Sequence, residues 1–111
     1  MSPIVEVTDA TFANEVLGSP LPVMLDLWGE WCEPCKALEP VVGEIARTYA
    51  GKMKVCRMDV GSNPRATHAL HVQSVPTLIF IKSGQVVGQH TGTARARDLA
   101  GKIEDHLGLA G

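Results

Sequence analysis

Two cysteines, Cys32 and Cys35, are the residues of this sequence best suited to chemistry. They follow an apolar run typical of a buried strand and begin a helical pattern, so we expect both at the start of a helix. Cysteines three residues apart lie on one face of the first turn and are close enough to form a disulfide. The helix dipole and the free N–H groups of that turn favour a thiolate, which makes Cys32 the predicted nucleophile and Cys35 the resolving thiol.

This pair predicts thiol–disulfide exchange. A Cys32 thiolate attacks a target disulfide to form a mixed disulfide, and Cys35 then attacks Cys32 and releases the reduced target. We expect Cys35 to be the more buried of the two, so its thiol needs a proton acceptor. Asp26, inside the apolar strand that leads to the cysteines, is the candidate, because burial there would raise its pKa. The alternative is a structural acid paired with Arg57 or a backbone amide.

The elements that position these residues follow from the hydrophobic pattern. Segments rich in β-branched residues alternate with segments whose apolar residues recur at helical spacing. The strand before the cysteines is apolar on both faces, as in a central strand covered by helices on each side. Strands are predicted at 4–7, 22–28, 53–60, 75–81 and 85–90, and helices at 10–17, 32–51, 65–70 and 94–107. This order predicts a three-layer α/β/α domain with a mixed sheet that ends in a hairpin.

Local signals add three expectations. The first strand should lie at an edge of the sheet. Thr8 or Asp9 should cap the first helix, because both side chains can accept a hydrogen bond from a free backbone N–H. Pro40 should kink the long helix, because it removes one backbone hydrogen bond and clashes with the carbonyl four residues earlier.

Composition limits the class of protein. The 111 residues fit one domain spanning 1–111, with 45% apolar and 20% charged residues. A formal net charge of -2 favours neither nucleic acid nor an anionic membrane as a partner. The first residues lack the basic and apolar segments of a secretion signal, and no apolar run reaches the ~18 residues of a membrane span. Three cysteines fit a reducing compartment better than a structural disulfide framework. We expect a soluble, cytoplasmic protein. We also expect it to act as a monomer.

The segment Trp28-Gly29-Glu30-Trp31-Cys32-Glu33-Pro34-Cys35-Lys36 resembles the active site of the thioredoxin family, usually Trp-Cys-Gly-Pro-Cys-Lys. The likeness extends over essentially the whole chain. It continues through Pro40, Ser74-Val75-Pro76-Thr77, Lys82-Ser83-Gly84 and Thr91-Gly92. The resemblance implies five strands in the order 1-3-2-4-5, with the fourth antiparallel to its neighbours, and four helices. It also implies that no cofactor is bound, since the redox group is the Cys32–Cys35 disulfide itself.

The resemblance assigns further roles by position. It implies a cis peptide bond before Pro76, against the ordinary preference for trans, and a free backbone at Val75 on which an extended substrate can pair. Other matched positions form an apolar rim for transient docking: Trp31, Val60, Gly61, Thr91 and Gly92. Arg57 matches a lysine that lies near the buried acid. Trp28 is expected to pack beneath the active-site loop as a core aromatic.

Glu33 departs from the family, which generally has glycine at this position. A carboxylate ~6 Å from the Cys32 sulfur would oppose the thiolate by ~0.7 kcal/mol, or roughly half a pKa unit. A less stable thiolate makes the pair more reducing, by on the order of 15 mV relative to Glu33→Gly. Alternatively, Glu33 points to solvent without measurable effect, or alters which partners dock. Pro34 between the cysteines is typical of a redox turn.

The remaining cysteine and the histidines invite other interpretations. Cys56 should face away from Asp26, because adjacent residues of a strand point to opposite faces, and we expect an inert core thiol, with regulation by oxidation as the alternative. His68 and His71 with the cysteine pair resemble a zinc ligand set, but the spacing is too long. We therefore predict no metal site. His90 and His106 are expected to be solvated.

The predicted function is reduction of protein disulfides, with electrons from an NADPH-dependent reductase of the kind that serves the thioredoxin family. A disulfide isomerase or oxidase is one alternative, disfavoured because no cationic residue stands between the cysteines to stabilise the thiolate. The other alternative is a thioredoxin-fold subunit that serves a partner protein without redox chemistry. The presence of Cys32, Cys35, Asp26 and Pro76 together argues against it.

Overall fold

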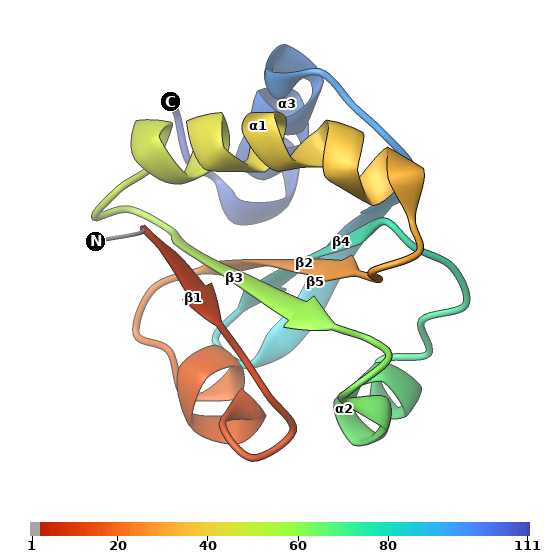
Figure 1. Ribbon diagram of the computed structural model, residues 1–111. Helices are drawn as coiled ribbons and strands as arrows, with labels where there is room; N and C mark the ends of the chain where they lie inside the picture. The colour runs from red at the N-terminus through yellow and green to blue at the C-terminus, as the bar shows by residue number, and fades with distance from the viewer. Residues whose placement is uncertain (1–2) are drawn as a thin grey trace.

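The computed structural model describes residues 3–111 and forms three layers around one five-stranded sheet (Figure 1). The strand order is β1-β3-β2-β4-β5; β2 runs parallel to β3 and antiparallel to β4. The elements are β1 (Ile4–Glu6), η1 (Ala13–Leu17), β2 (Val23–Trp28), α1 (Glu33–Thr48), β3 (Lys54–Asp59), α2 (Pro64–Ala69), β4 (Thr77–Lys82), β5 (Gln85–Thr91) and α3 (Ala96–Leu107). The predicted fold and strand order are confirmed, and β1 is an edge strand as expected.

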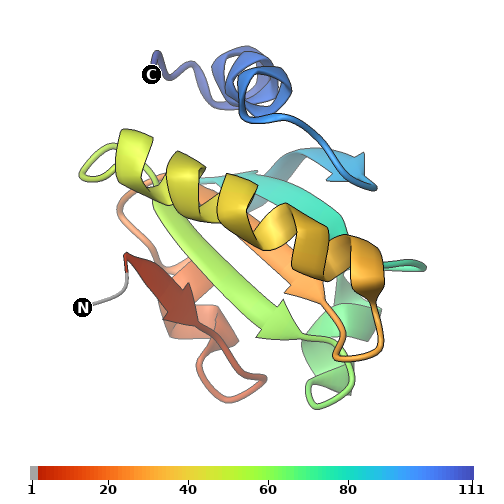
Figure 2. The ribbon, with the colours of Figure 1, turned by 45° about the horizontal axis from the view of Figure 1, so that its top comes forward.

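Helices α1 and α3 cover one face of the sheet, and η1 and α2 cover the other (Figures 1 and 2). Successive residues of a strand point to opposite faces, so the central strand β2 contributes to both cores. Met24 packs in the cluster beneath α1 and α3, whereas Val23 and Leu25 pack in the cluster on the side of η1 and α2. Asp26 is the charged residue of this buried strand and lies on the α1 side, in phase with Met24. None of the helices within residues 3–111 is both long and apolar enough to cross a membrane.

The β4–β5 hairpin closes through a two-residue turn. Ser83 (φ 51°) and Gly84 (φ 74°) both have positive φ, the geometry of the tight turns whose twist matches that of the flanking strands. The pairing passes from Phe80 opposite Gly88 to Ile81 opposite Val86, which leaves Val87 in a bulge. The bulge lies in the edge strand β5, where it interrupts a ladder that another chain could otherwise extend.

The first helix differs from its prediction. It is a short π-helix that begins at Ala13, with a hydrogen bond from Gly18 N to Ala13 O (2.8 Å), and no side chain caps it. The Asp9 carboxylate instead accepts hydrogen bonds from Arg65 N (3.1 Å) and Ala66 N (2.8 Å). Asp9 therefore caps the free N–H groups of α2, because the fold brings the segment after β1 next to the start of that helix. α1 continues through Pro40, and the kink expected there remains a prediction.

The histidines expected to be solvated are in fact half-buried. His90 Nε2 donates a hydrogen bond to the Thr93 carbonyl (3.0 Å). His106 stacks on Phe80, with ring centroids 5.5 Å apart and an interplanar angle of 22°. Helical spacing along α3 did not reveal this contact, because it depends on how α3 crosses β4 and β5.

We expect Gly88→Ala to destabilise the protein. A Cβ at position 88 would lie 2.6 Å from three atoms of the His106 ring, including Cγ next to its backbone attachment, so the ring or α3 must move off Phe80. Overpacking of this kind costs about 1–3 kcal/mol of unfolding free energy. Urea denaturation at constant m value measures the change.

Gly101→Ala is the matched control. Gly101 lies within α3, and a Cβ there meets no atom within 4 Å, so this variant should gain up to about 1 kcal/mol through helix propensity. A Gly88→Ala protein as stable as wild type would contradict the close approach of His106 to β5.

Candidate active site

The site forms at one edge of the sheet, beyond the carboxyl ends of β2 and β3 (Figure 1). The turn after β2 leads directly into α1, and Cys32 is the N-cap residue of that helix, with extended backbone angles (φ -95°, ψ 102°). Its sulfur accepts a hydrogen bond from Cys35 N (3.1 Å), one of the backbone N–H groups that the helix leaves unpaired. A negative charge on Cys32 Sγ would be stabilised by this bond and by the helix dipole.

Cys32 and Cys35 form a disulfide, with their Cα atoms 5.3 Å apart. The two residues are almost equally buried, with exposed fractions of 5% and 6%. The expectation that Cys35 is more buried than Cys32 is therefore wrong for this oxidised form. The physical reason is that the bonded sulfur atoms lie against each other, so each shields its neighbour from solvent.

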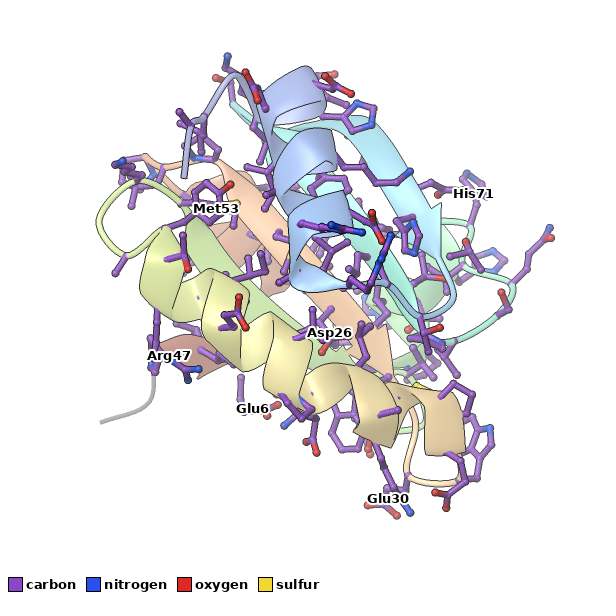
Figure 3. The ribbon with its side chains drawn as sticks, turned by 90° about the horizontal axis from the view of Figure 1, so that it is seen from above. Glu6, Asp26, Glu30, Arg47, Met53 and His71 are labelled. Carbon is purple, nitrogen blue, oxygen red and sulfur yellow. A yellow bond between two sulfur atoms is a disulfide. The ribbon has the colours of Figure 1, made fainter. Side chains whose placement is uncertain are left out.

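Asp26 lies in the middle of β2 and is only 4% exposed. In the view of Figure 3 its carboxyl lies between α1 and α3. Burial raises its pKa from 3.8 to about 6, the Arg57 guanidinium opposes this rise, and the Glu39 and Glu6 carboxylates add to it. A carboxyl with a pKa near 6 can gain and lose a proton around neutral pH, which is the property expected of a general base.

Arg57 lies beside Asp26 in the parallel β2–β3 pair, but its ion pairs are made with other residues. Its Nε lies 3.4 Å from Glu6 Oε1, and its Nη2 lies 3.3 Å from Glu39 Oε1. Its Cζ lies 4.3 Å from the centroid of the Trp28 ring, a cation–π contact. Trp28 is half-buried and lines a cavity together with Gly29 and Cys35, and its packing beneath the active-site loop remains a prediction.

A groove of about 310 Å³ lies against Trp31, the residue before Cys32. Predicted rim residues Trp31, Val60 and Val75 line it. Ser74, from the family-like segment Ser74-Val75-Pro76-Thr77, also lines it. The sequence analysis missed the other lining residues, Thr67 of α2 and Val72 and Gln73 of the following loop, which no motif marks.

The peptide bond between Val75 and Pro76 is cis, as the resemblance implied. Pro76 is buried, and its carbonyl accepts a hydrogen bond from Gly92 N (2.9 Å). Thr91 is the register partner of Thr77, the residue after the proline. The start of β4 and the end of β5 are thereby brought together at this edge, where Gly92 has a φ of 95°, a conformation that suits glycine.

Trp31 is 67% exposed, and its ring packs against the backbone of two glycines. A Cβ at Gly29 would lie 2.7–2.9 Å from its six-membered ring, and one at Gly61 would lie 3.4 Å from it. Gly61 is held by its N–H, which donates to Asp59 Oδ1 (2.9 Å). The absence of side chains at 29 and 61 lets the indole lie close to the backbone of both glycines.

Glu33 is 83% exposed and forms an ion pair with Lys36 (3.2 Å) one turn along α1. Pro34 follows Glu33 in the first turn of α1, where its missing N–H costs no helix hydrogen bond. The Lys36 ammonium, paired with Glu33, would offset part of any repulsion between Glu33 and a Cys32 thiolate. The tuning roles of Glu33, Pro34 and Arg57 remain predictions.

Cys56 is a buried free thiol on the opposite side of the sheet from Asp26, as its strand phase predicted. Burial raises its pKa to about 11, so the thiolate is scarce at neutral pH. Within residues 3–111, no cluster of three or more His, Cys, Asp or Glu side chains is placed to hold a metal ion.

A second cavity, of about 320 Å³, lies behind the disulfide. Cys35, Trp28 and Arg57 line it together with Glu39, which the sequence analysis did not consider. The available signal was helical spacing, because residue 39 follows Cys35 by four positions and so lies on the same face of α1.

The fold and the position of the disulfide together define a thiol–disulfide oxidoreductase whose redox group is its own Cys32–Cys35 pair. The profile of the family described as Thioredoxin matches residues 3–105. Thioredoxin 1 of Nostoc sp. is 42% identical over 107 residues, which are 96% of this chain and all of that protein. Thioredoxin of Haemophilus influenzae is 40% identical with the same coverage, and thioredoxin of Rickettsia prowazekii is 46% identical over 79 residues, 71% of this chain and 75% of its own. The chain belongs to the thioredoxin family.

Proposed function

We propose that this protein reduces disulfides in other proteins, with Cys32 as the nucleophile. The observation that carries the proposal is the place of the Cys32 sulfur at the N-cap of α1, where it accepts the Cys35 N–H. The same bond and dipole that favour the thiolate make Cys32 the sulfur that attacks.

In the first step the Cys32 thiolate attacks one sulfur of the substrate disulfide. A new S–S bond forms between Cys32 and the substrate, and the other substrate sulfur leaves as a thiolate. In the second step the Cys35 thiol gives its proton to Asp26 and attacks the Cys32 sulfur. The second substrate sulfur leaves, so the substrate gains two electrons and the protein ends as the disulfide.

The substrate proposed is an extended segment that lies in the groove between Trp31 and Val75. The backbone of Val75, next to the cis bond, would pair with the substrate backbone, and main-chain hydrogen bonds do not select a sequence. The apolar rim residues Val60, Thr91 and Gly92 would make brief, nonspecific contacts. A broad range of protein substrates follows.

The proposed electron source is an NADPH-dependent thioredoxin reductase, on the strength of the family. The proposed compartment is the cytoplasm, since one working pair of cysteines and one buried free thiol suit a reducing environment. We propose that the protein works there as a monomer and that residues 1–111 act as one domain.

The equilibrium potential of the Cys32–Cys35 pair tests this function. Equilibration with a glutathione or dithiothreitol buffer should give a value near or below about -270 mV, the figure typical of thioredoxin. A value above about -200 mV would contradict a reductase and would favour the isomerase or oxidase alternative. Full activity of a Cys32→Ser, Cys35→Ser protein in its biological role would favour the non-redox alternative.

The same redox titration measures the effect of Glu33 on the potential of the Cys32–Cys35 pair. Removal of its carboxylate in Glu33→Gly should raise the potential by no more than on the order of 15 mV, because Lys36 already offsets part of its field. Lys36→Gln is the matched variant and should lower the potential, since it removes a cation that favours the thiolate. An unchanged or lower potential in Glu33→Gly would exclude a tuning role for Glu33.

A further inference from the structure

Glu6, Arg57 and Asp26 form a row across three neighbouring parallel strands. In the register of the sheet, Arg57 of β3 lies opposite Glu6 of β1 on one side and Asp26 of β2 on the other. Paired residues of parallel strands point to the same face, so the guanidinium stands between two carboxyl groups. Both carboxyl groups are therefore possible ion-pair partners of Arg57. Among residues 3–111, Arg57 forms its ion pairs with Glu6 and Glu39, and none with the buried carboxyl of Asp26.

Glu39, which lies outside the sheet, is the second ion-pair partner of Arg57. It lies on α1, one turn after Cys35, and its Oε1 lies 3.3 Å from Arg57 Nη2. Glu6 contacts the other end of the guanidinium, at Nε (3.4 Å). In Figure 3, Glu6 lies on the far side of α1 from Asp26. Both carboxylates thus attract Arg57 away from the position of Asp26.

The contacts that hold Arg57 are electrostatic. Its buried Nε atom has no hydrogen bond of proper geometry, so charge and the contact with the Trp28 ring keep the guanidinium in place. The cavity of about 320 Å³ beside Arg57 and Cys35 gives the side chain room to move. Loss of one carboxylate would leave Asp26 as a competing partner.

We propose that Glu39, assisted by Glu6, is a positioning residue that holds Arg57 on Trp28 and so keeps Asp26 free to accept the proton of Cys35. An Asp26 carboxylate paired directly with Arg57 would be stabilised in its charged form and would be a weaker base. The inference rests on the proposed role of Asp26 in the second step of disulfide exchange. The charged groups that bear on Asp26 are Arg57, Glu39 and Glu6; across β4 its register partner is the apolar Leu78.

The test is a pH titration of Asp26 in the disulfide form, where neither active-site cysteine titrates. The NMR chemical shift of the Asp26 carboxyl carbon monitors the titration. Glu39→Gln should lower the pKa of Asp26 by about one unit or more, as expected when an arginine moves next to a carboxylate. The Trp28 indole resonances should shift in the same variant, because the guanidinium leaves the ring. Glu30→Gln is the matched control: Glu30 is exposed and lines the same cavity but makes no ion pair with Arg57, so it should change neither.

A double-mutant cycle separates positioning from the direct field of Glu39. If Glu39 acts by holding Arg57, then Glu39→Gln should have little further effect on the pKa of Asp26 in an Arg57→Gln background. An equal shift in both backgrounds, or no shift in wild type, would overturn the proposal. The cycle does not depend on the catalytic role of Asp26, which is tested separately by the rate of mixed-disulfide resolution in Asp26→Asn.

The kinetic consequence is a change in the pH profile of the second step. In Glu39→Gln, the pH at which resolution by Cys35 reaches half its maximal rate should move in the same direction as the Asp26 titration. If Asp26→Asn resolves as fast as wild type at every pH, the proton-acceptor role fails, while the titration still decides whether Glu39 positions Arg57.

Discussion

Cys35→Ser is expected to stop turnover while the first attack on the substrate persists. Cys32 keeps its place at the N-cap of α1, so its thiolate still forms a mixed disulfide with the substrate. The serine hydroxyl does not displace the substrate sulfur, because its pKa is far above that of a thiol. We expect multiple-turnover reduction of a disulfide-bonded protein such as insulin to fall by about 1,000-fold or more, and the covalent adduct to accumulate.

Intact-protein mass spectrometry measures the adduct, which dithiothreitol should release. Cys32→Ser should form no adduct, because the nucleophile itself is missing. Cys56→Ala should turn over like wild type, since Cys56 lies on the other side of the sheet and is buried. Adduct formation through Cys35 in the Cys32→Ser protein would reverse the proposed order of attack.

Asp26→Asn is expected to stabilise the protein above pH 6. Burial raises the pKa of Asp26 from 3.8 to about 6 in the folded state. Between these two values the folded state binds more protons than the unfolded state, so stability falls as the pH rises. Above pH 6 the buried charge costs the wild type up to about 3 kcal/mol of unfolding free energy, and the asparagine variant avoids this cost.

Urea denaturation of the disulfide form at pH 4 and pH 8 measures the effect. The gain in Asp26→Asn should be close to its maximum at pH 8 and should shrink towards pH 4, where Asp26 is largely neutral in the wild type. Glu30→Gln, which removes an exposed carboxylate, should change stability by no more than about 0.5 kcal/mol. A variant gain that is equal at both pH values would show that the charge of Asp26 is not its cause.

Stability and catalysis make opposite demands at Asp26. The buried carboxyl destabilises the fold at neutral pH, and the same burial gives it the pKa that a general base requires. Glu6 and Glu39 attract the Arg57 guanidinium, the cation that would otherwise stabilise the Asp26 carboxylate. They therefore keep the pKa of Asp26 high and add to the loss of stability at neutral pH. Loss of the positioning carboxylates should therefore also raise the stability of the folded state at pH 8.

The parts of the site that depend on short-range geometry could be predicted from the sequence. Cys32 and Cys35 are three residues apart at the start of a helical pattern, and this spacing predicted that they could form a disulfide at the helix N-terminus, as they do. The strand phase placed Cys56 on the far side of the sheet from Asp26. Periodicity predicted the strands and helices, and the family resemblance supplied their order and the cis bond before Pro76.

Contacts between segments distant in the chain follow from the three-dimensional packing of the elements and could not be predicted. The cap that Asp9 provides to α2 and the stack of His106 on Phe80 arise where separate elements meet, so local propensity carried no sign of them. The row of Glu6, Arg57 and Asp26 depends on the register of three strands, and Glu39 joins it through the way α1 lies over the sheet. Register and helix placement are set by the packing of the whole core, which is why the partner of Arg57 could not be predicted from the sequence.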